Sequence, residues 1–178
     1  DKNVMEKIKS GNFFALSDFN IQKLNDQLKR NNQYLIIKLH PYEMNLVKSS
    51  QQSVSNIKLL SNEYLEDNKI DLYEIIGATD FLITDFSSIY FDYLLLNKPI
   101  IFIDNLLEQY INKRGLLLSP YQEIVPGELV DNQRKLLDSL AKIDEDEFKE
   151  YRQFWKKITL ERNNNCCQAV YELTKRMK

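Results

Sequence analysis

The chain has 178 residues, a formal net charge of -2 and a hydrophobic fraction of 43%. That length supports one domain with a single sizeable core, and the near-neutral charge excludes the global basic field that would attract nucleic acid. No apolar run approaches the ~20 residues of a membrane-spanning helix, and the start shows no signal-peptide pattern. Cys166 and Cys167 are neighbours, which would strain a disulfide between them, so we expect reduced thiols in a cytoplasmic protein.

The first predicted helix follows Ser17 or Asp18, either of which can serve as its N-cap. Its apolar residues repeat at helical spacing, as Ile21, Leu24 and Leu28. The next segment, QYLIIKLHP, is typical of a buried strand over residues 34–39. Because the residue before a proline avoids helical dihedral angles, we expect the chain to change direction at His40-Pro41.

Between residues 42 and 103 the pattern alternates between helices and strands. We expect, in chain order, a polar helix over 42–52, a strand over 56–60, a loop over 61–69, a helix over 71–77 with Gly77 as its C-cap, a strand over 81–84, a helix over 88–96 and a strand over 100–103. This alternation predicts βαβ units and a parallel sheet flanked by helices, a Rossmann-like α/β fold. The nearly continuous apolar strands indicate a sheet that is covered on both faces.

The pattern changes after Asp104. Residues 106–126 are rich in turn signals, so we expect a loop-rich segment there. Three C-terminal helices should follow, over 132–143, 145–158 and 164–177, with most of their charges on solvated faces.

Polar residues follow two of the predicted strands. His40 follows the first strand, and Asp85, Ser87 and Ser88 follow the strand over 81–84. In open parallel sheets, ligands bind beyond the carboxyl ends of the strands, so both groups should share one rim. The serines also lie where the next helix begins, and a helix start offers free N–H groups to an anion. Ser87 is equally a candidate N-cap, a role that leaves other N–H groups free.

Asp92 comes four residues after Ser88, so both side chains lie on one face of the predicted helix. A carboxylate is a poor partner for phosphate. A functional Asp92 would therefore hold a sugar or glycerol hydroxyl, or orient a neighbouring donor. The alternative is a structural carboxylate that accepts hydrogen bonds from nearby N–H groups or hydroxyls.

His40 is the only histidine, and both a structural and a functional role are open to it. A phosphate dianion favours the charged, donating imidazole, so phosphate binding fits His40 better than general-base chemistry. Arg114, in front of Gly115, could reach phosphate bidentately, and Lys38 and Lys98 are expected near the same rim. No Walker loop, G-x-G-x-x-G motif or metal-ligand spacing is present, so we expect neither a metal nor a cofactor.

A longer pattern carries a family resemblance. The segments IIKLHP and DLYEIIGATDFLITDFSSIYFDYLLLNKPIIF, followed by RG and PGELV, resemble the CDP-glycerol glycerophosphotransferases of teichoic-acid and capsule synthesis. The similarity runs over about residues 24–130, and the HP pair combined with TD-aromatic-SS-x-x-x-D is its most specific part. The resemblance implies a GT-B fold, in which two Rossmann-like halves enclose the active site, and this chain is similar to the C-terminal, nucleotide-binding half.

The resemblance also implies residue roles and a reaction. It assigns donor phosphate binding to His40, Ser87, Ser88 and Arg114, and support of the donor or its glycerol to Asp85 and Asp92. It implies no catalytic base in this half, because the base would be a histidine of the other half. The implied reaction is attack of an acceptor hydroxyl on the β-phosphate of CDP-glycerol, with CMP leaving.

Finally, the resemblance implies a setting for the chain. Residues 1–178 would form one donor-binding domain of a larger, two-domain bacterial cell-wall enzyme, and would turn over poorly alone. Its partners would be CDP-glycerol or a related CDP-polyol, a lipid-linked or polymer acceptor and the missing N-terminal half, with no nucleic acid. The full protein would be cytoplasmic and peripheral at the inner face of the membrane. Two alternatives stay open: a GT-B glycosyltransferase that uses CMP-sialic acid or a UDP-sugar, and a non-catalytic α/β interaction module.

Overall fold

The computed structural model describes residues 2–45, 47, 54–116, 119–160 and 165–176. The described strands are β1 (Leu35–Ile37), β2 (Ile57–Leu59), β3 (Leu82–Thr84), β4 (Ile100–Ile103) and β5 (Glu128–Val130). The described helices are α1 (Lys2–Lys9), α2 (Ile21–Arg30), α3 (Pro41–Met44), α4 (Asn62–Asn68), α5 (Leu72–Ala78), α6 (Ile89–Tyr93), α7 (Leu107–Arg114), α8 (Tyr121–Ile124), α9 (Gln133–Ala141), α10 (Lys149–Thr159) and α11 (Cys166–Arg176).

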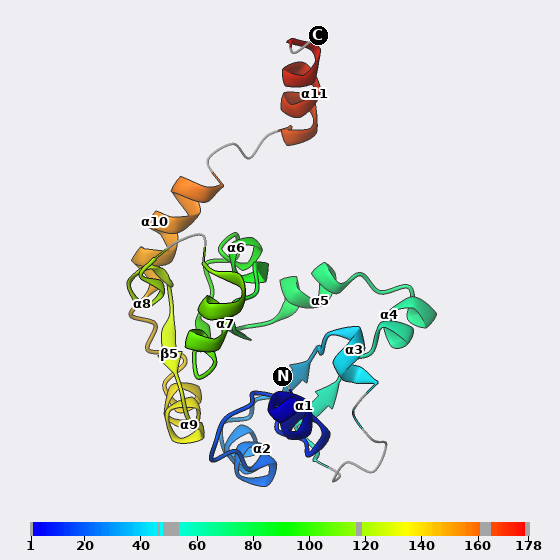
Figure 1. The fold of residues 1–178 in the computed structure, drawn as a ribbon, viewed down its shortest axis with the longest axis vertical. Coiled ribbons are helices and arrows are strands. Elements are labelled where there is room, and N and C mark those ends of the chain that lie inside the picture. The colour runs from blue at the N-terminus through cyan, green and yellow to red at the C-terminus, as the bar shows by residue number, and fades with distance from the viewer. Residues whose placement is uncertain (1, 46, 48–53, 117–118, 161–164, 177–178) are drawn as a thin grey trace.

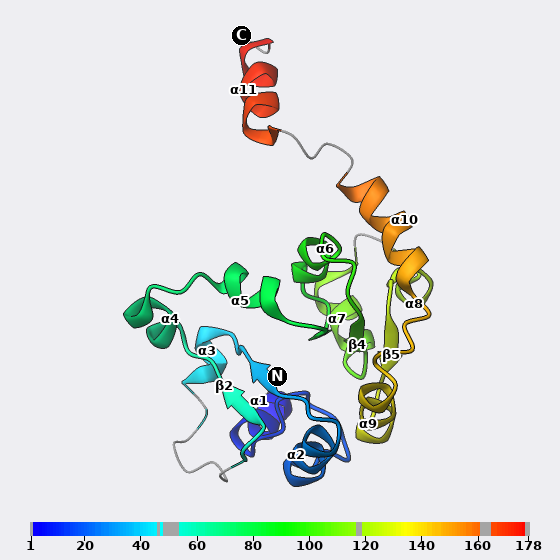
Figure 2. The same ribbon diagram turned by 180° about the vertical axis from the view of Figure 1, so that it is seen from behind.

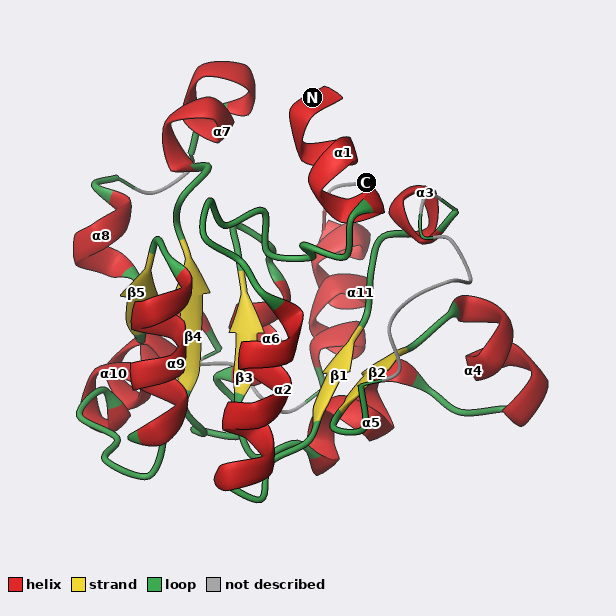
Figure 3. Ribbon diagram, turned by 90° about the horizontal axis from the view of Figure 1, so that it is seen from below, coloured by secondary structure: helices red, strands yellow, loops and turns green. Residues whose placement is uncertain are grey.

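The strands form two parallel ladders that stand in one row. β1 pairs with β2, and β3, β4 and β5 pair in that order, in each case parallel. Figure 3 shows the row β5–β4–β3–β1–β2, so β1 and β3 are the strands that face each other across the junction of the two ladders. The predicted α/β fold with a parallel sheet flanked by helices is confirmed.

The central strand β4 shows why the sheet is buried on both faces. All four of its residues are buried, and successive side chains of a strand point to opposite faces. Ile101 and Ile103 pack with α1, α2 and α9 in one apolar cluster, together with residues of β1 and β5. Ile100 and Phe102 pack into a second cluster with α6, α7 and α8. The apolar run in β4 therefore joins two layers of helices to one sheet.

The arrangement of the helices follows these two clusters. In Figure 1, α1, α2 and α9 lie on one side of the strands, and α5, α6, α8 and α10 lie on the other side. Figure 2 shows from behind that α11 lies beyond α10, apart from the sheet. Among the described residues, no helix is both long and apolar enough to cross a membrane.

Several helix ends differ from those predicted. The N-cap of α2 is Asn20, whose side chain accepts a hydrogen bond from Lys23 N–H, whereas Asp18 accepts one from Gln133 N–H and so ties this segment to α9. Gly77 lies inside α5, and Thr79 is the C-cap. α6 ends at Tyr93, before the predicted residue 96. The polar helix predicted over 42–52 is described only as α3, because most of its remainder lies outside the described residues.

Two predictions about loops were wrong. The segment predicted as a loop over 61–69 contains α4, which Ser61 caps at the start and Lys69 ends in a left-handed conformation. The loop-rich segment contains α7 and α8, and β5 follows it. Among the charged residues of the C-terminal helices, Arg152 of α10 is an exception to the solvated faces expected for most of them: it is fully buried, pairs with Asp146 and donates to the Asn97 carbonyl at 3.3 Å.

Candidate functional site

The two predicted groups of polar residues lie at the junction of the two ladders. The chain passes from β1 to β2 on one side of this junction, and from β3 to β4 and β5 on the other. This reversal of strand order is a topological switch point, where open α/β sheets bind ligands beyond the carboxyl ends of their strands. His40 follows β1, and Asp85, Ser87 and Ser88 follow β3, so the structure brings both groups to the edge where the arrowheads point in Figure 3.

The loop after β3 is organised by its own side chains. The Asp85 Oδ1 atom accepts a hydrogen bond from Ser87 N–H at 3.2 Å, and the Ser87 Oγ atom accepts one from Ile89 N–H at 3.4 Å. Ser88 occupies the N-cap position of α6, but its side chain makes no capping bond within the described structure. Ser87 therefore serves as a local cap, and the Ser88 hydroxyl is the one left to meet a ligand.

An aromatic cluster holds this loop against the sheet. The Phe86 ring centroid lies 4.7 Å from that of Tyr110 and 5.5 Å from that of Tyr121. The Tyr121 hydroxyl donates to the Asp85 carbonyl at 3.2 Å, and its ring meets Phe102 of β4 edge-on at 6.3 Å. The loop is thus fixed through Phe86 and the Asp85 carbonyl, while Asp85, Ser87 and Ser88 stay exposed on its outer side.

Asp85 is exposed, but the loop shields part of its carboxylate from solvent. This burial raises the pKa of Asp85, and the hydrogen bond from Ser87 N–H opposes that rise. A carboxylate in this position repels a phosphate, so its contribution is to shape the loop through Ser87. The predicted role of Asp85 in supporting the donor or its glycerol stays a prediction.

His40 is exposed at the start of α3 and takes part in a reciprocal capping arrangement. Its Nδ1 atom accepts a hydrogen bond from the Tyr42 backbone N–H at 3.3 Å, and the His40 backbone N–H donates one to Glu43 Oε2 at 3.2 Å. An accepting Nδ1 carries no proton, so the ring proton of the neutral imidazole lies on Nε2. His40 therefore offers one outward N–H donor while its other nitrogen caps α3.

Asp92 is exposed on α6 and has a partner that the sequence did not reveal. Its Oδ2 atom accepts a hydrogen bond from the Tyr73 hydroxyl of α5 at 3.0 Å. The carboxylate is therefore oriented by a neighbouring helix. This contact leaves its other oxygen without a partner among the described residues.

Arg114 ends α7 and is exposed, in front of Gly115 with its positive φ of 72°. It lies four residues after Tyr110, on the same face of α7 that packs on Phe86. Its guanidinium makes no hydrogen bond or ion pair within the part of the chain that the structure describes. Arg114 thus belongs to a helix that contacts the loop after β3.

The two lysines predicted near this rim separate in the structure. Lys38 lies at the end of β1, and its Nζ atom donates to the Leu39 carbonyl at 3.1 Å. Lys98 precedes β4, at the opposite, amino-terminal edge of the sheet, and binds the Thr79 carbonyl there. The prediction for Lys98 was wrong because the link between α6 and β4 runs along the far edge.

Two hollows lie away from the serines and His40. One, of about 390 Å³, lies between α2 and α9 with lining charges of both signs, among them Lys23, Arg134 and Asp138. The other, of about 310 Å³, lies beyond β4 and β5 and is lined by Asp104 and Asp131. Burial, and then the nearby Asp131 charge, raise the pKa of Asp104. Carboxylates of this kind disfavour a phosphate, so neither hollow replaces the switch point as the candidate anion site.

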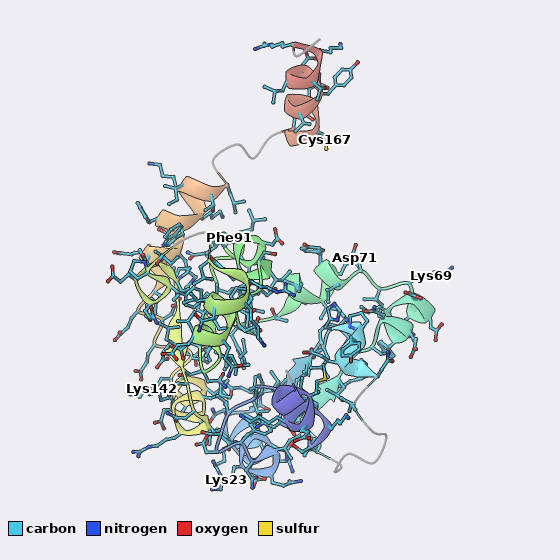
Figure 4. All side chains as sticks on the ribbon, viewed as in Figure 1. Lys23, Lys69, Asp71, Phe91, Lys142 and Cys167 are labelled. Atoms are coloured by element: carbon cyan, nitrogen blue, oxygen red, sulfur yellow. The ribbon has the colours of Figure 1, made fainter. Side chains whose placement is uncertain are left out.

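The described residues give little support to a metal site or to thiol chemistry at the switch point. No group of three His, Cys, Asp or Glu side chains lies close enough together there to hold a metal ion. Cys167 is a free thiol, exposed on α11 and distant from the switch point in Figure 4.

Sequence reasoning missed Tyr73, Tyr110 and Tyr121, which act through contacts between distant segments. Their only signal in the sequence was an abundance of Tyr and Phe.

The fold and this edge define a Rossmann-like α/β protein with a candidate ligand site at its switch point. Solved structures share the fold. The wall teichoic acid polymerase TagF matches with a TM-score of 0.61 and 20% identity, over 99% of this chain and 48% of that chain. A TagF variant soaked with CDPG matches with a TM-score of 0.64 and 21% identity, over 99% and 46% of the two chains.

Sequence comparison gives the family. Residues 4–173 match the family described as CDP-Glycerol:Poly(glycerophosphate) glycerophosphotransferase. The chain belongs to this family, which confirms the resemblance.

Curated relatives include the teichoic acid glycerol-phosphate primase of Bacillus subtilis, 34% identical over 69% of this chain and 32% of the relative. The teichoic acid ribitol-phosphate polymerase TarL of Staphylococcus aureus is 32% identical over 74% of this chain and 22% of the relative. The teichoic acid glycerol-phosphate transferase of the same species is 26% identical over 94% of this chain and 42% of the relative. The chain therefore spans less than half the length of these three relatives.

Proposed function

We propose that residues 1–178 form the donor-binding domain of a polyol-phosphate transferase of teichoic-acid synthesis. The full enzyme would transfer glycerol phosphate from CDP-glycerol to an acceptor hydroxyl and release CMP. One observation carries this proposal: in a chain of the glycerophosphotransferase family, His40 and the Asp85–Ser88 loop follow the two strands that flank the switch point, both at the carboxyl edge of the sheet.

The arrangement suits a diphosphate better than a neutral ligand. The Ser88 hydroxyl and the Nε2–H group of His40 are hydrogen-bond donors that the protein itself leaves unused in the described structure. Arg114 adds a guanidinium on the helix that contacts Phe86, and guanidinium groups bind phosphate bidentately. Together these groups would hold the two donor phosphates from both sides of the junction.

The chemistry proposed for these residues is positioning and charge neutralisation. The acceptor oxygen attacks the β-phosphorus, the bond from that phosphorus to the bridging oxygen breaks, and CMP leaves with the bonding electrons. Donors fixed where negative charge develops stabilise the transition state without having to reorganise. The base that takes the acceptor proton would come from the other half of the enzyme, so we expect little turnover by this chain alone.

The remaining roles follow from the same proposal. Asp92 would accept hydrogen bonds from the polyol of the donor, either glycerol or ribitol, since names of both kinds occur among the relatives. The further partners would be a lipid-linked or polymer acceptor and the N-terminal half of a GT-B fold. We place the full enzyme in the cytoplasm, at the inner face of the cell membrane, in the synthesis of teichoic acid or a related capsule polymer.

Donor titration monitored by NMR tests the proposal. CDP-glycerol should shift the resonances of His40 and of Ser87 to Asp92, whereas CMP-sialic acid and UDP-sugars should not. Replacing Ser88 with alanine should weaken binding about ten- to hundredfold, since a hydrogen bond to a charged group contributes roughly 1.5–3 kcal/mol. Ser61→Ala is the control outside the site: Ser61 is the N-cap of α4, where its side chain accepts a hydrogen bond from Tyr64 N–H, so this variant loses a helix cap and should still bind CDP-glycerol as the wild type does. Unchanged resonances at millimolar CDP-glycerol would refute the proposal.

A further inference from the structure

The contact between Tyr73 and Asp92 joins two helices beside the candidate site. The Tyr73 hydroxyl donates to the Asp92 Oδ2 atom at 3.0 Å, across 19 positions of sequence. Tyr73 is 57% exposed, so its ring adds little to the core. A tyrosine that is mostly in solvent yet holds a carboxylate is better explained by a role for that carboxylate than by packing.

The start of α5 fixes the position of Tyr73. Asp71 is the N-cap of α5, and its Oδ1 atom accepts from Tyr73 N–H at 2.8 Å. Glu74 completes the capping box by accepting from Asp71 N–H at 3.2 Å. Figure 4 labels Asp71 at this end of α5. Because Tyr73 N–H is bonded to the N-cap side chain, and the capping box fixes the first turn of α5, the Tyr73 hydroxyl is presented to α6 from a defined point.

The electrostatics make Tyr73 the donor in this pair. The hydrogen bond to Asp92, followed by the negative charge of Asp92, raises the pKa of Tyr73. The phenol therefore keeps its proton around neutral pH and donates a hydrogen bond to the Asp92 carboxylate. With Oδ2 engaged, Asp92 presents its second oxygen to solvent, where it has no partner among the described residues.

The position of Asp92 relates it to the serines. Asp92 lies four residues after Ser88 in α6, which places the two side chains on one face and about one turn, ~5 Å, apart. A three-carbon polyol attached to a phosphate spans a similar length. A ligand whose phosphate meets Ser88 could thus bring a hydroxyl to the free oxygen of Asp92.

We propose that Tyr73 is a positioning residue that orients Asp92 to accept a hydroxyl of the donor polyol. This inference rests on the proposed function and deepens it, since it assigns recognition of the hydroxylated part of the donor to the Tyr73–Asp92 pair. Tyr73 acts through Asp92 and leaves the nucleotide and its phosphates to other residues. The pair therefore distinguishes CDP-glycerol from CDP, which has the same diphosphate but no polyol.

Calorimetric titration of the 178-residue chain with CDP-glycerol and with CDP tests this inference. Tyr73→Phe should weaken CDP-glycerol binding about three- to tenfold, the loss typical of one hydrogen bond, and leave CDP binding unchanged. In an Asp92→Ala background the same substitution should have no further effect, because the two residues act as one unit. Tyr93→Phe is the matched control, since its hydroxyl also links α6 to the end of α5, through Thr79 at 3.0 Å, but does not contact Asp92.

The outcomes separate the two proposals. If the wild-type chain binds CDP and CDP-glycerol but Tyr73→Phe weakens both equally, or neither, the role of Tyr73 is refuted and the donor site stands. An equal loss of CDP-glycerol affinity in Tyr93→Phe would show that the link between the helices matters and not the orientation of Asp92, which also overturns the inference. If the wild-type chain binds neither ligand, the proposed function and this inference fail together.

Discussion

The two segments that follow β1 and β3, on either side of the switch point, are held in different ways. The loop after β3, residues 85–88, is anchored: Phe86 packs between Tyr110 and Tyr121, and the Asp85 carbonyl is bonded to a buried tyrosine. The segment after β1, from His40 through α3, is held mainly by caps: α3 contains no fully buried residue, is closed by His40 and Glu43, and contacts the core through the partly buried Met44.

This difference indicates that the two loops would contribute to ligand binding in different ways. An anchored loop keeps its donors in place before a ligand arrives, which lowers the entropic cost of binding. A short, exposed segment that is held by its own caps moves more easily and can close on a ligand. The serines would thus form the fixed side of the site, and His40 the adjustable side. Four predictions test this comparison.

The largest expected effect is on the stability of the anchored side. Phe102 is fully buried and packs on Tyr90 and Tyr121. Phe102→Ala should reduce the free energy of unfolding by about 3–5 kcal/mol, because it removes transfer energy and leaves a cavity. Chemical denaturation measures this loss.

Tyr42→Ala is the counterpart on the capped side. Tyr42 is 57% exposed on α3, so its removal should change the free energy of unfolding by about 0.5 kcal/mol or less. Equal losses in the two variants would contradict the distinction between the loops.

The second prediction separates the cap from the ligand on the capped side. His40→Ala should lower stability by only about 0.5–1 kcal/mol, the usual range for losing a helix cap, but should weaken CDP-glycerol binding about tenfold. His40→Asn restores a good N-cap without the imidazole N–H. It should therefore recover stability but not affinity, as thermal unfolding and calorimetry can show. Recovery of affinity in His40→Asn would mean that His40 acts only as a cap.

The position of the two loops could be predicted from the sequence, but the contacts that hold them could not. That His40 and the serines share an edge follows from strand order and apolar runs, both of which are local signals, and the strand over 100–103 was predicted with its observed bounds. The anchoring of the loop could not be predicted, because Tyr110 and Tyr121 reach Phe86 from 24 and 35 positions later in the chain. α4 was missed because its caps, and not an apolar stripe, define it.

The third prediction removes one anchor. Tyr121→Phe loses the hydrogen bond to the Asp85 carbonyl, and should cost about 1 kcal/mol of stability and a few-fold in donor affinity. Burial raises the pKa of Tyr121, so its hydroxyl remains a donor throughout the working pH range. Tyr90→Phe is the matched control within the same cluster: burial raises its pKa to about 12, but its hydroxyl makes no hydrogen bond to other described residues. A loss in Tyr90→Phe as large as in Tyr121→Phe would show that the hydroxyl of Tyr121 is not an anchor.

The smallest expected effect is a pH dependence that has opposite signs at two carboxylates. Burial raises the pKa of Asp85 above its ordinary 3.8, so the folded state binds this proton more tightly than the unfolded state does, and stability falls as pH rises through the interval between the two pKa values. Asp85→Asn cannot ionise but keeps an Oδ1 acceptor for Ser87 N–H. Its Tm should match that of the wild type near pH 3 and exceed it slightly near pH 7, by an amount that solvent contact keeps small.

Asp131 provides the matched comparison, because its hydrogen bond to Lys135 lowers its pKa. The stability that Asp131 adds is present above its unfolded pKa and is lost as pH falls through the folded pKa. Asp131→Asn should therefore lower Tm near pH 7 and approach the wild type in acid. Thermal unfolding of both variants across this pH range gives the signs directly. If Asp85→Asn also lowered Tm near pH 7, the ionised Asp85 carboxylate would be a stabilising part of the anchored loop, and the fixed side of the site would depend on its charge as well as on its aromatic contacts.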